Sequence, residues 1–193
     1  MRLDRRTALI LVDVQNDFCP GGALPVPEGD RVVPILNRYI RFFQEAGASI
    51  YATRDWHPSD HLSFKEQGGI WPPHCIRGTP GAEFHPALES PADSTIISKG
   101  TDPKREAYSG FQGTDLGERL KYQGIDRLLI GGLATDYCVK STVLDALKLG
   151  FKTIFLKDAS KGVEVHPGDT ERAIAEIKTG GAGLISVQDL TPE

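Results

Sequence analysis

The chain has 193 residues, of which 39% are hydrophobic and 25% charged, and its formal net charge is −4 at pH 7. This size and composition predict a single globular domain over residues 1–193, and the absence of a basic block argues against nucleic acid or a membrane surface as partner. The first apolar run is interrupted by Asp13, too early for a signal peptide or a membrane span. Three cysteines do not suggest a disulfide framework, so a cytoplasmic location is expected.

Predicted strands and helices alternate along the chain. Residues 7–14 form an apolar, β-branched run typical of a strand buried on both faces, and residues 32–46 have apolar side chains at helical spacing. Further strands are expected at 49–53, 94–98, 127–131, 153–156 and 184–187, and further helices at 115–123, 138–149 and 170–178. We therefore expect an α/β fold with three layers, α/β/α, around a six-stranded and mostly parallel sheet.

Residues 55–91 interrupt this alternation. The segment is rich in proline, glycine, histidine and tryptophan and has no clear period. It contains four of the five histidines, namely His57, His61, His74 and His85. Long irregular segments inside compact domains are usually functional, so we expect this one to contribute to a site.

Polar residues lie at or just beyond the C-terminal ends of four of the predicted strands: Asp13, Asp55, Lys99 and Cys138. With a strand order of 3-2-1-4-5-6, the order reverses between the first and fourth strands, and ligands bind at such a reversal. Each residue alone has an ordinary explanation, as a turn residue, a strand end, a solvated lysine or a core cysteine. Their occurrence at four strand ends together favours an active site.

Cys138 lies where a buried strand and two glycines, Gly131 and Gly132, give way to a predicted helix. Backbone N–H groups at a helix N-terminus favour negative charge, so they lower a thiol pKa and can hold an oxyanion. Asp13 could accept the thiol proton, and Lys99 could stabilise both the carboxylate and the thiolate. These residue types predict nucleophilic hydrolysis of an amide or a close relative through an acyl-enzyme.

A second chemical group is expected in the irregular segment. Asp55 and His57 form an Asp-x-His pair, and His74 follows. One carboxylate and two imidazoles suit a divalent ion such as zinc, iron or manganese. The pattern is weak by itself, since solvated or core histidines are common. His61 could join the ligands or support them from outside.

Five segments together carry a family resemblance. They are Leu-Val-Asp-Val-Gln-Asn-Asp-Phe at 11–18, Thr-Arg-Asp-Trp-His-Pro at 53–58, Trp-Pro-Pro-His-Cys at 71–75, Ser-Lys-Gly at 98–100 and Gly-Leu-Ala-Thr-Asp-Tyr-Cys at 132–138. With these segments the chain resembles the nicotinamidase (pyrazinamidase) branch of the isochorismatase-like cysteine hydrolases, over essentially its whole length. The first and last segments mark the superfamily. The Asp-Trp-His and Trp-Pro-x-His segments select the nicotinamidase branch, because many relatives lack the metal.

The resemblance implies an isochorismatase-like fold and assigns roles to the site residues. Asp13, Lys99 and Cys138 would be the catalytic triad. Asp55, His57 and His74 would hold one divalent ion, with zinc favoured and iron or manganese as alternatives. That ion would bind the pyridine nitrogen of the substrate and orient it.

The resemblance also implies how the substrate is held. Phe18 and Trp71 would sandwich the pyridine ring, with Leu133, Ala134 and Tyr137 bordering the pocket. A cis peptide would precede Ala134, and the backbone N–H groups of Ala134 and Cys138 would form the oxyanion hole. The segment 108–111 would lie near the pocket or at a subunit contact.

The implied reaction is hydrolysis of nicotinamide to nicotinate and ammonia through a Cys138 thioester, with pyrazinamide as a further substrate. The expected partner is this small molecule, and a homo-oligomer is left open. An alternative is a metal-free isochorismatase-like or carbamoyl-amide hydrolase that keeps the triad. A third alternative is a non-catalytic protein on the same fold, because fold alone does not give function.

Overall fold

The computed structural model describes residues 1, 3–90 and 94–190. Six strands form one sheet in the order β3-β2-β1-β4-β5-β6, and every neighbouring pair is parallel. The strands are β1 (Thr7–Val12), β2 (Ser49–Asp55), β3 (Thr95–Lys99), β4 (Arg127–Leu133), β5 (Lys152–Lys161) and β6 (Gly183–Ile185). The helices are α1 (Val32–Glu45), α2 (Leu116–Tyr122), α3 (Lys140–Lys148) and α4 (Asp169–Thr179). The predicted fold class and strand order are confirmed.

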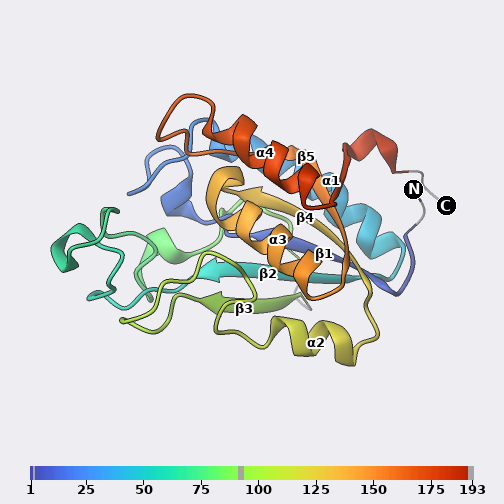
Figure 1. The fold of residues 1–193 in the computed structure, drawn as a ribbon, viewed down its shortest axis with the longest axis horizontal. Coiled ribbons are helices and arrows are strands. Elements are labelled where there is room, and N and C mark those ends of the chain that lie inside the picture. Colours follow the sequence, from blue (N-terminus) through green and yellow to red (C-terminus); the bar gives the residue numbers. More distant parts are fainter. Residues whose placement is uncertain (2, 91–93, 191–193) are drawn as a thin grey trace.

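Helices cover the sheet on both faces, with α1 behind it in Figure 1 and α3 and α4 in front. Successive side chains of a strand point to opposite faces, so a central strand with helices on both sides must be apolar throughout. In β1, Leu9 and Leu11 pack in one core cluster with Leu36 of α1. Ile10 packs in the other cluster with Val143 of α3. This pattern explains why the first strand reads as an unbroken apolar run.

The element boundaries differ from prediction at a few places. The expected helix from Cys138 begins earlier, as a π-helical turn over Thr135–Val139 that precedes α3. The expected strand at 184–187 ends at Ile185, because Ser186 and Asp189 cap each other around the short 3₁₀ turn Val187–Asp189. β5 runs on to Lys161, past its predicted end.

Two expectations fall partly on residues that the structure does not describe. The predicted irregular segment ends at position 91, and positions 91–93 lie outside the described residues, as do 2 and 191–193. The single domain expected over residues 1–193 therefore stays a prediction. Within the described ranges, none of the helices has the length and apolar character needed to cross a membrane.

Gly132 allows β4 to pass close to β1. Its φ is 131°, and a Cβ at this position would lie 2.1 Å from the backbone oxygen of Val12. We expect Gly132→Ala to lower the free energy of unfolding by roughly 3 kcal/mol, because both the backbone conformation and the contact oppose a side chain. Gly150→Ala is the control, since Gly150 has a φ of 88° but no atom within 4 Å of the added Cβ. It should cost about 1–2 kcal/mol. Equal losses in urea unfolding would refute the close-approach argument.

Candidate active site

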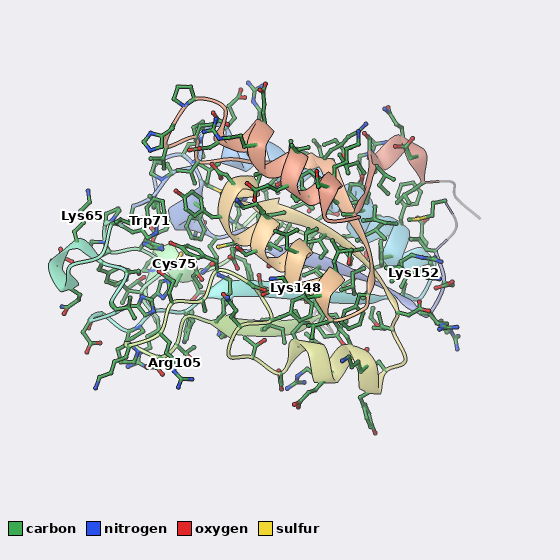
Figure 2. The ribbon with its side chains drawn as sticks, viewed as in Figure 1. Lys65, Trp71, Cys75, Arg105, Lys148 and Lys152 are labelled. Carbon is green, nitrogen blue, oxygen red and sulfur yellow. The ribbon has the colours of Figure 1, made fainter. Side chains whose placement is uncertain are left out.

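The carboxyl ends of four adjacent strands gather the residues that the sequence singled out. Asp55 of β2 is the register partner of Lys99 in β3, and Asp13 follows β1 directly. Cys138 lies just beyond β4. The strand order reverses between β1 and β4, as predicted, so Asp13 and Cys138 lie on the two sides of that reversal. Figure 2 shows the loops with Trp71 and Cys75 at this end of the sheet, whereas Lys152 starts β5 at the other end.

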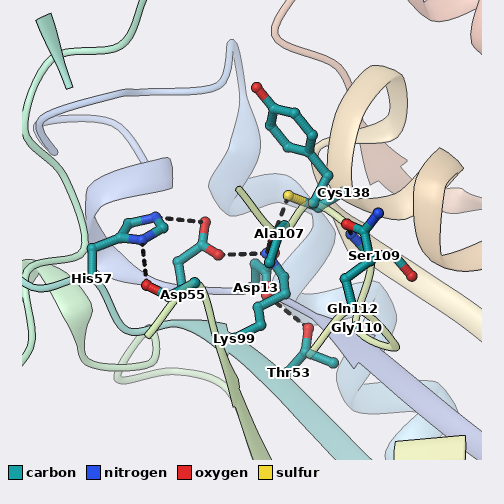
Figure 3. A network of polar contacts seen from close by, with 12 residues as sticks. Asp13, Thr53, Asp55, His57, Lys99, Ala107, Ser109, Gly110, Gln112 and Cys138 are labelled. Carbon is teal, nitrogen blue, oxygen red and sulfur yellow. Dashed lines mark hydrogen bonds and ion pairs between the residues drawn. The ribbon is translucent and has the colours of Figure 1, made fainter. Parts of the chain in front are cut away.

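Lys99 is the centre of the polar network in Figure 3. Its side chain is completely buried, and its Nζ lies 2.9 Å from Oδ2 of Asp13. The same Nζ donates to Oδ1 of Asp55 and, at 3.1 Å, to the carbonyl oxygen of Ala107. Its distance to Sγ of Cys138 is 3.4 Å. One ammonium group therefore contacts the thiol and both carboxylates.

The carboxylates keep this buried lysine charged. Burial acts to lower the pKa of Lys99, but Asp13 and Asp55 outweigh it and hold that pKa well above its ordinary value. The pKa of Asp55 is also raised by burial and lowered by Lys99 and His57, and the lowering effects prevail. An ammonium and a carboxylate therefore face each other as a charged pair, which is how buried charges are normally stabilised.

Asp13 is held in a conformation that leaves one oxygen available. Its φ is 49°, and its Oδ1 accepts a hydrogen bond of 2.7 Å from the Thr53 hydroxyl. Its Oδ2 receives no aligned hydrogen bond from any residue that the structure describes, although it faces Lys99. Burial raises the pKa of Asp13 above its ordinary value, against the effect of Lys99. A carboxylate of raised pKa whose second oxygen is engaged by an ion pair alone suits proton transfer.

The thiol of Cys138 is within reach of that oxygen. A carboxylate oxygen of Asp13 and Sγ of Cys138 lie within 4.8 Å of each other. Burial raises the pKa of the Cys138 thiol well above its ordinary value, although Lys99 acts in the opposite direction. This differs from the lowered pKa expected for a helix N-terminus, because desolvation of the thiolate outweighs the favourable charges. The resting thiol is therefore protonated and needs a base.

Asp55, His57 and His74 form a compact group of metal donors, and their ligand atoms lie within 4.8 Å of one another. His57 Nδ1 lies 2.9 Å from the carbonyl oxygen of Gly100, and His74 Nδ1 lies 2.8 Å from that of Pro72. A carbonyl oxygen only accepts, so each Nδ1 carries a hydrogen, which leaves Nε2 as the ring nitrogen that could bind a metal ion. Metal-binding histidines are commonly oriented by such contacts, so the donor set fits a divalent ion.

His61 does not belong to this donor group. Its Nδ1 lies 2.7 Å from the Ser63 hydroxyl, and its Nε2 lies 3.0 Å from the carbonyl oxygen of Arg105. Both ring nitrogens are thus engaged by protein atoms. The ring packs against that of His57, with 4.2 Å between the centroids. His61 therefore supports the donor group by packing.

A pocket opens onto the thiol and the donor group. Phe18, Trp71, Ala134 and Tyr137, all expected at the substrate, line it. It is lined further by Leu24, Asp55, His57, Ser63, His74, Glu106, Ala107, Tyr108, Cys138 and Val163. Leu133 is fully buried in the core cluster that contains α1 and is not among the residues lining this pocket. The peptide bond between Leu133 and Ala134 is cis, as the family resemblance implied.

Tyr108 and Glu106 are pocket residues that the sequence did not single out one by one. The Trp71 indole donates a hydrogen bond of 3.0 Å to the Tyr108 hydroxyl. Both rings pack against Tyr137, with centroid distances of 5.0 Å and 5.6 Å. This places the segment after Lys99 at the pocket wall. No periodic pattern marks that segment, so only its position a few residues after Lys99 in the sequence could have indicated that it lies at the pocket.

This combination of a parallel sheet and buried polar side chains at its carboxyl edge defines a class, the parallel α/β hydrolases. The model of the isochorismatase domain family matches residues 7–189. The chain therefore belongs to the isochorismatase family, and the resemblance seen in the sequence is confirmed.

Within this family, the chain is similar to proteins named as nicotinamidases and pyrazinamidases. It is 43% identical to a nicotinamidase of Escherichia coli, over 94% of this chain and 95% of that protein. It is 40% identical to a nicotinamidase/pyrazinamidase of Mycobacterium tuberculosis, over 92% and 97%. The crystal structure of the Pyrococcus horikoshii pyrazinamidase in complex with zinc matches with a TM-score of 0.90 at 56% identity, covering 94% of this chain and 99% of that one.

Proposed function

We propose that this chain is a nicotinamidase that hydrolyses nicotinamide to nicotinate and ammonia, and that it also accepts pyrazinamide. The observation that carries the proposal is the contact of Lys99 with Asp13, Asp55 and Cys138, which joins a nucleophile to a group of metal donors. The nicotinamidase relatives, aligned over nearly the whole chain, support the same substrate.

Asp13 acts as base and then as acid in the proposed reaction. Its Oδ2 takes the proton of the Cys138 thiol as sulfur attacks the amide carbon, and the carbonyl oxygen becomes negative. The backbone N–H groups of Ala134 and Cys138 stabilise that oxygen. When the C–N bond breaks, Asp13 returns the proton to the leaving nitrogen, which departs as ammonia. Asp13 then deprotonates a water that hydrolyses the thioester, releasing nicotinate and the thiol.

Lys99 holds these charges in place. Its ammonium stays protonated between two carboxylates and stabilises the thiolate as it forms. Phe18, Trp71 and Tyr137 line the pocket, and in the proposed complex Phe18 and Trp71 sandwich the pyridine ring while Tyr137 borders it. Aromatic walls favour a flat heteroaromatic ring over an aliphatic amide.

Asp55, His57 and His74 would hold one divalent ion, zinc by preference and iron or manganese as alternatives. When bound, the ion supplies a Lewis acid that the pyridine nitrogen can coordinate, which orients the substrate. The donor group favours a metal-dependent enzyme over a metal-free relative, because backbone carbonyl oxygens at Nδ1 already orient the rings of His57 and His74.

Replacing His57 tests the metal and the substrate together. We expect native protein to release ammonia from nicotinamide and to contain about one ion per chain, whereas His57→Ala should bind the ion at least roughly 10²-fold more weakly. His85→Ala is the control, because His85 lies outside the donor group. Ammonia release and metal content are measured on the same samples. A folded, metal-loaded protein that releases no ammonia would exclude nicotinamide, and full activity without metal would favour the metal-free relatives.

A further inference from the structure

Gln15 is buried without any exposed surface, and its side chain binds the backbone of a proposed metal ligand. Its Oε1 accepts a hydrogen bond of 2.8 Å from the N–H of Asp55. Its Nε2 donates to the carbonyl oxygens of Asp55 and Ala82, both at 2.8 Å. The Gln15 amide therefore uses its acceptor oxygen and both of its hydrogens, and it binds both the N–H and the carbonyl oxygen of Asp55.

The backbone explains why a side chain is needed there. β1 and β2 pair as far as Val12 and Thr53, and the N–H of Asp13 still donates to the oxygen of Thr53 at 3.1 Å. Asp13 then adopts a φ of 49° and the chain turns away from the sheet. From that turn the primary amide of Gln15 takes the place of the missing peptide group and continues the pairing to Asp55.

Asp17, two residues further on, likewise binds the backbone beside a second proposed ligand, His74. Its Oδ2 accepts a hydrogen bond of 2.7 Å from the N–H of Cys75, which directly follows His74. Its Oδ1 accepts one of 3.1 Å from the N–H of Ala23. The carbonyl oxygen of Cys75 in turn accepts from the N–H of His57 at 3.0 Å. The proposed ligands therefore belong to backbone segments held by one short turn.

We infer that Gln15 and Asp17 are positioning residues that set the spacing of Asp55, His57 and His74 before an ion binds. The inference rests on the metal site of the proposed function and adds the residues that preorganise it. Neither side chain lines the pocket or is one of the three donors, so both act through the backbone of the ligand-bearing segments. Loss of such outer contacts typically weakens metal binding 10- to 100-fold.

The sharpest test replaces an amide with a carboxylate at two neighbouring positions. Gln15→Glu keeps an acceptor for the N–H of Asp55 but removes both donated hydrogen bonds. Asn16→Asp is the matched control, because Asn16 also donates from its amide to a backbone oxygen, that of Pro80 at 2.8 Å, away from the ligand-bearing residues. Asp17→Asn is a second variant at a half-buried position, and it keeps the inference testable if Gln15→Glu does not fold.

The readout is binding of Co²⁺ and of Zn²⁺ to metal-depleted protein, by competition with a chromogenic chelator, together with the visible spectrum of bound Co²⁺. We expect dissociation constants about 10- to 100-fold higher for Gln15→Glu and Asp17→Asn, with an altered Co²⁺ spectrum, and less than about threefold change for Asn16→Asp. Thermal unfolding without metal is measured alongside, since a merely structural role would lower Tm and leave the affinity of the folded protein unchanged.

The outcomes separate this inference from the proposed function. If native protein binds one ion and the Gln15 and Asp17 variants bind it equally well, the positioning role is overturned and the nicotinamidase proposal stands. If native protein binds neither Co²⁺ nor Zn²⁺, the metal site and the positioning role fall together. Weaker binding in Asn16→Asp, of the same size as in Gln15→Glu, would also overturn the inference, since a disturbance anywhere on the turn would then suffice.

Discussion

Replacing Cys138 with alanine is expected to reduce ammonia release from nicotinamide by at least about 10⁴-fold while the protein stays folded and keeps its metal. Removal of a nucleophile that acts as one unit with its base leaves only binding and oxyanion stabilisation, and this residual catalysis is small. Sγ of Cys138 is the sulfur that contacts Lys99 and faces Asp13. No other thiol lines the pocket among the residues described.

Cys19→Ala is the control for this variant. Cys19 is also a buried free thiol, and burial together with Asp30 raises its pKa to about 11, but unlike Cys138 it does not line the pocket. Its replacement should leave the rate of ammonia release nearly unchanged. Steady-state rates and the metal content of each sample are measured together. Residual activity of Cys138→Ala above a few per cent of native would contradict the thioester route.

Replacing Lys99 with methionine is expected to lower the free energy of unfolding by about 3–5 kcal/mol and to abolish activity. The methionine fills much of the same space, but Asp13 and Asp55 are left buried without their shared cation, which is the costly way to break a buried ion pair. The loss should shrink as pH falls, because protonation of the unpaired carboxyl groups removes the buried negative charge. Urea unfolding at pH 5 and pH 7.5 measures the stability loss and its pH dependence, and ammonia release measures the activity.

Lys140→Met provides the comparison. Lys140 pairs with Glu176 at 3.0 Å, but its side chain is 25% exposed and that of its partner 54%. Such exposed pairs contribute at most about 1 kcal/mol. A double variant of Lys99→Met with Asp13→Asn should recover part of the stability and none of the activity. Similar stability losses for the two lysine variants would show that the Lys99 pair is no more important to folding than a surface contact.

Much of the site could be predicted from the sequence because the topology is strict. In a parallel sheet, residues that end neighbouring strands must meet at one edge, so the positions of Asp13, Asp55, Lys99 and Cys138 in the chain implied their proximity. The pairing of His57 with His74 came from residue types in an irregular segment, and the donor group that they form with Asp55 has the expected members.

Other features depend on three-dimensional details that the sequence pattern does not encode. That Lys99 contacts Asp55 as well as Asp13 follows from the exact register of β2 and β3. The hydrogen bonds of Gln15 depend on the left-handed turn at Asp13, a conformation that an aspartate tolerates but does not specify. Burial raises the pKa of Cys138, whereas its position at the start of a predicted helix indicated a lowered pKa.

The position of Lys99 has a thermodynamic consequence. A cation bound at Asp55 would compete with the Lys99 ammonium for the same carboxylate, and would so change the electrostatic potential at Asp13 and Cys138. Such coupling is reciprocal, so ionisation of the Cys138 thiol would alter cation affinity by the same factor by which the cation alters the acid dissociation constant of that thiol. Substitutions in the triad would therefore be non-additive with those in the donor group, and an inhibitor that modifies the Cys138 sulfur would also change the affinity for an ion in the donor group.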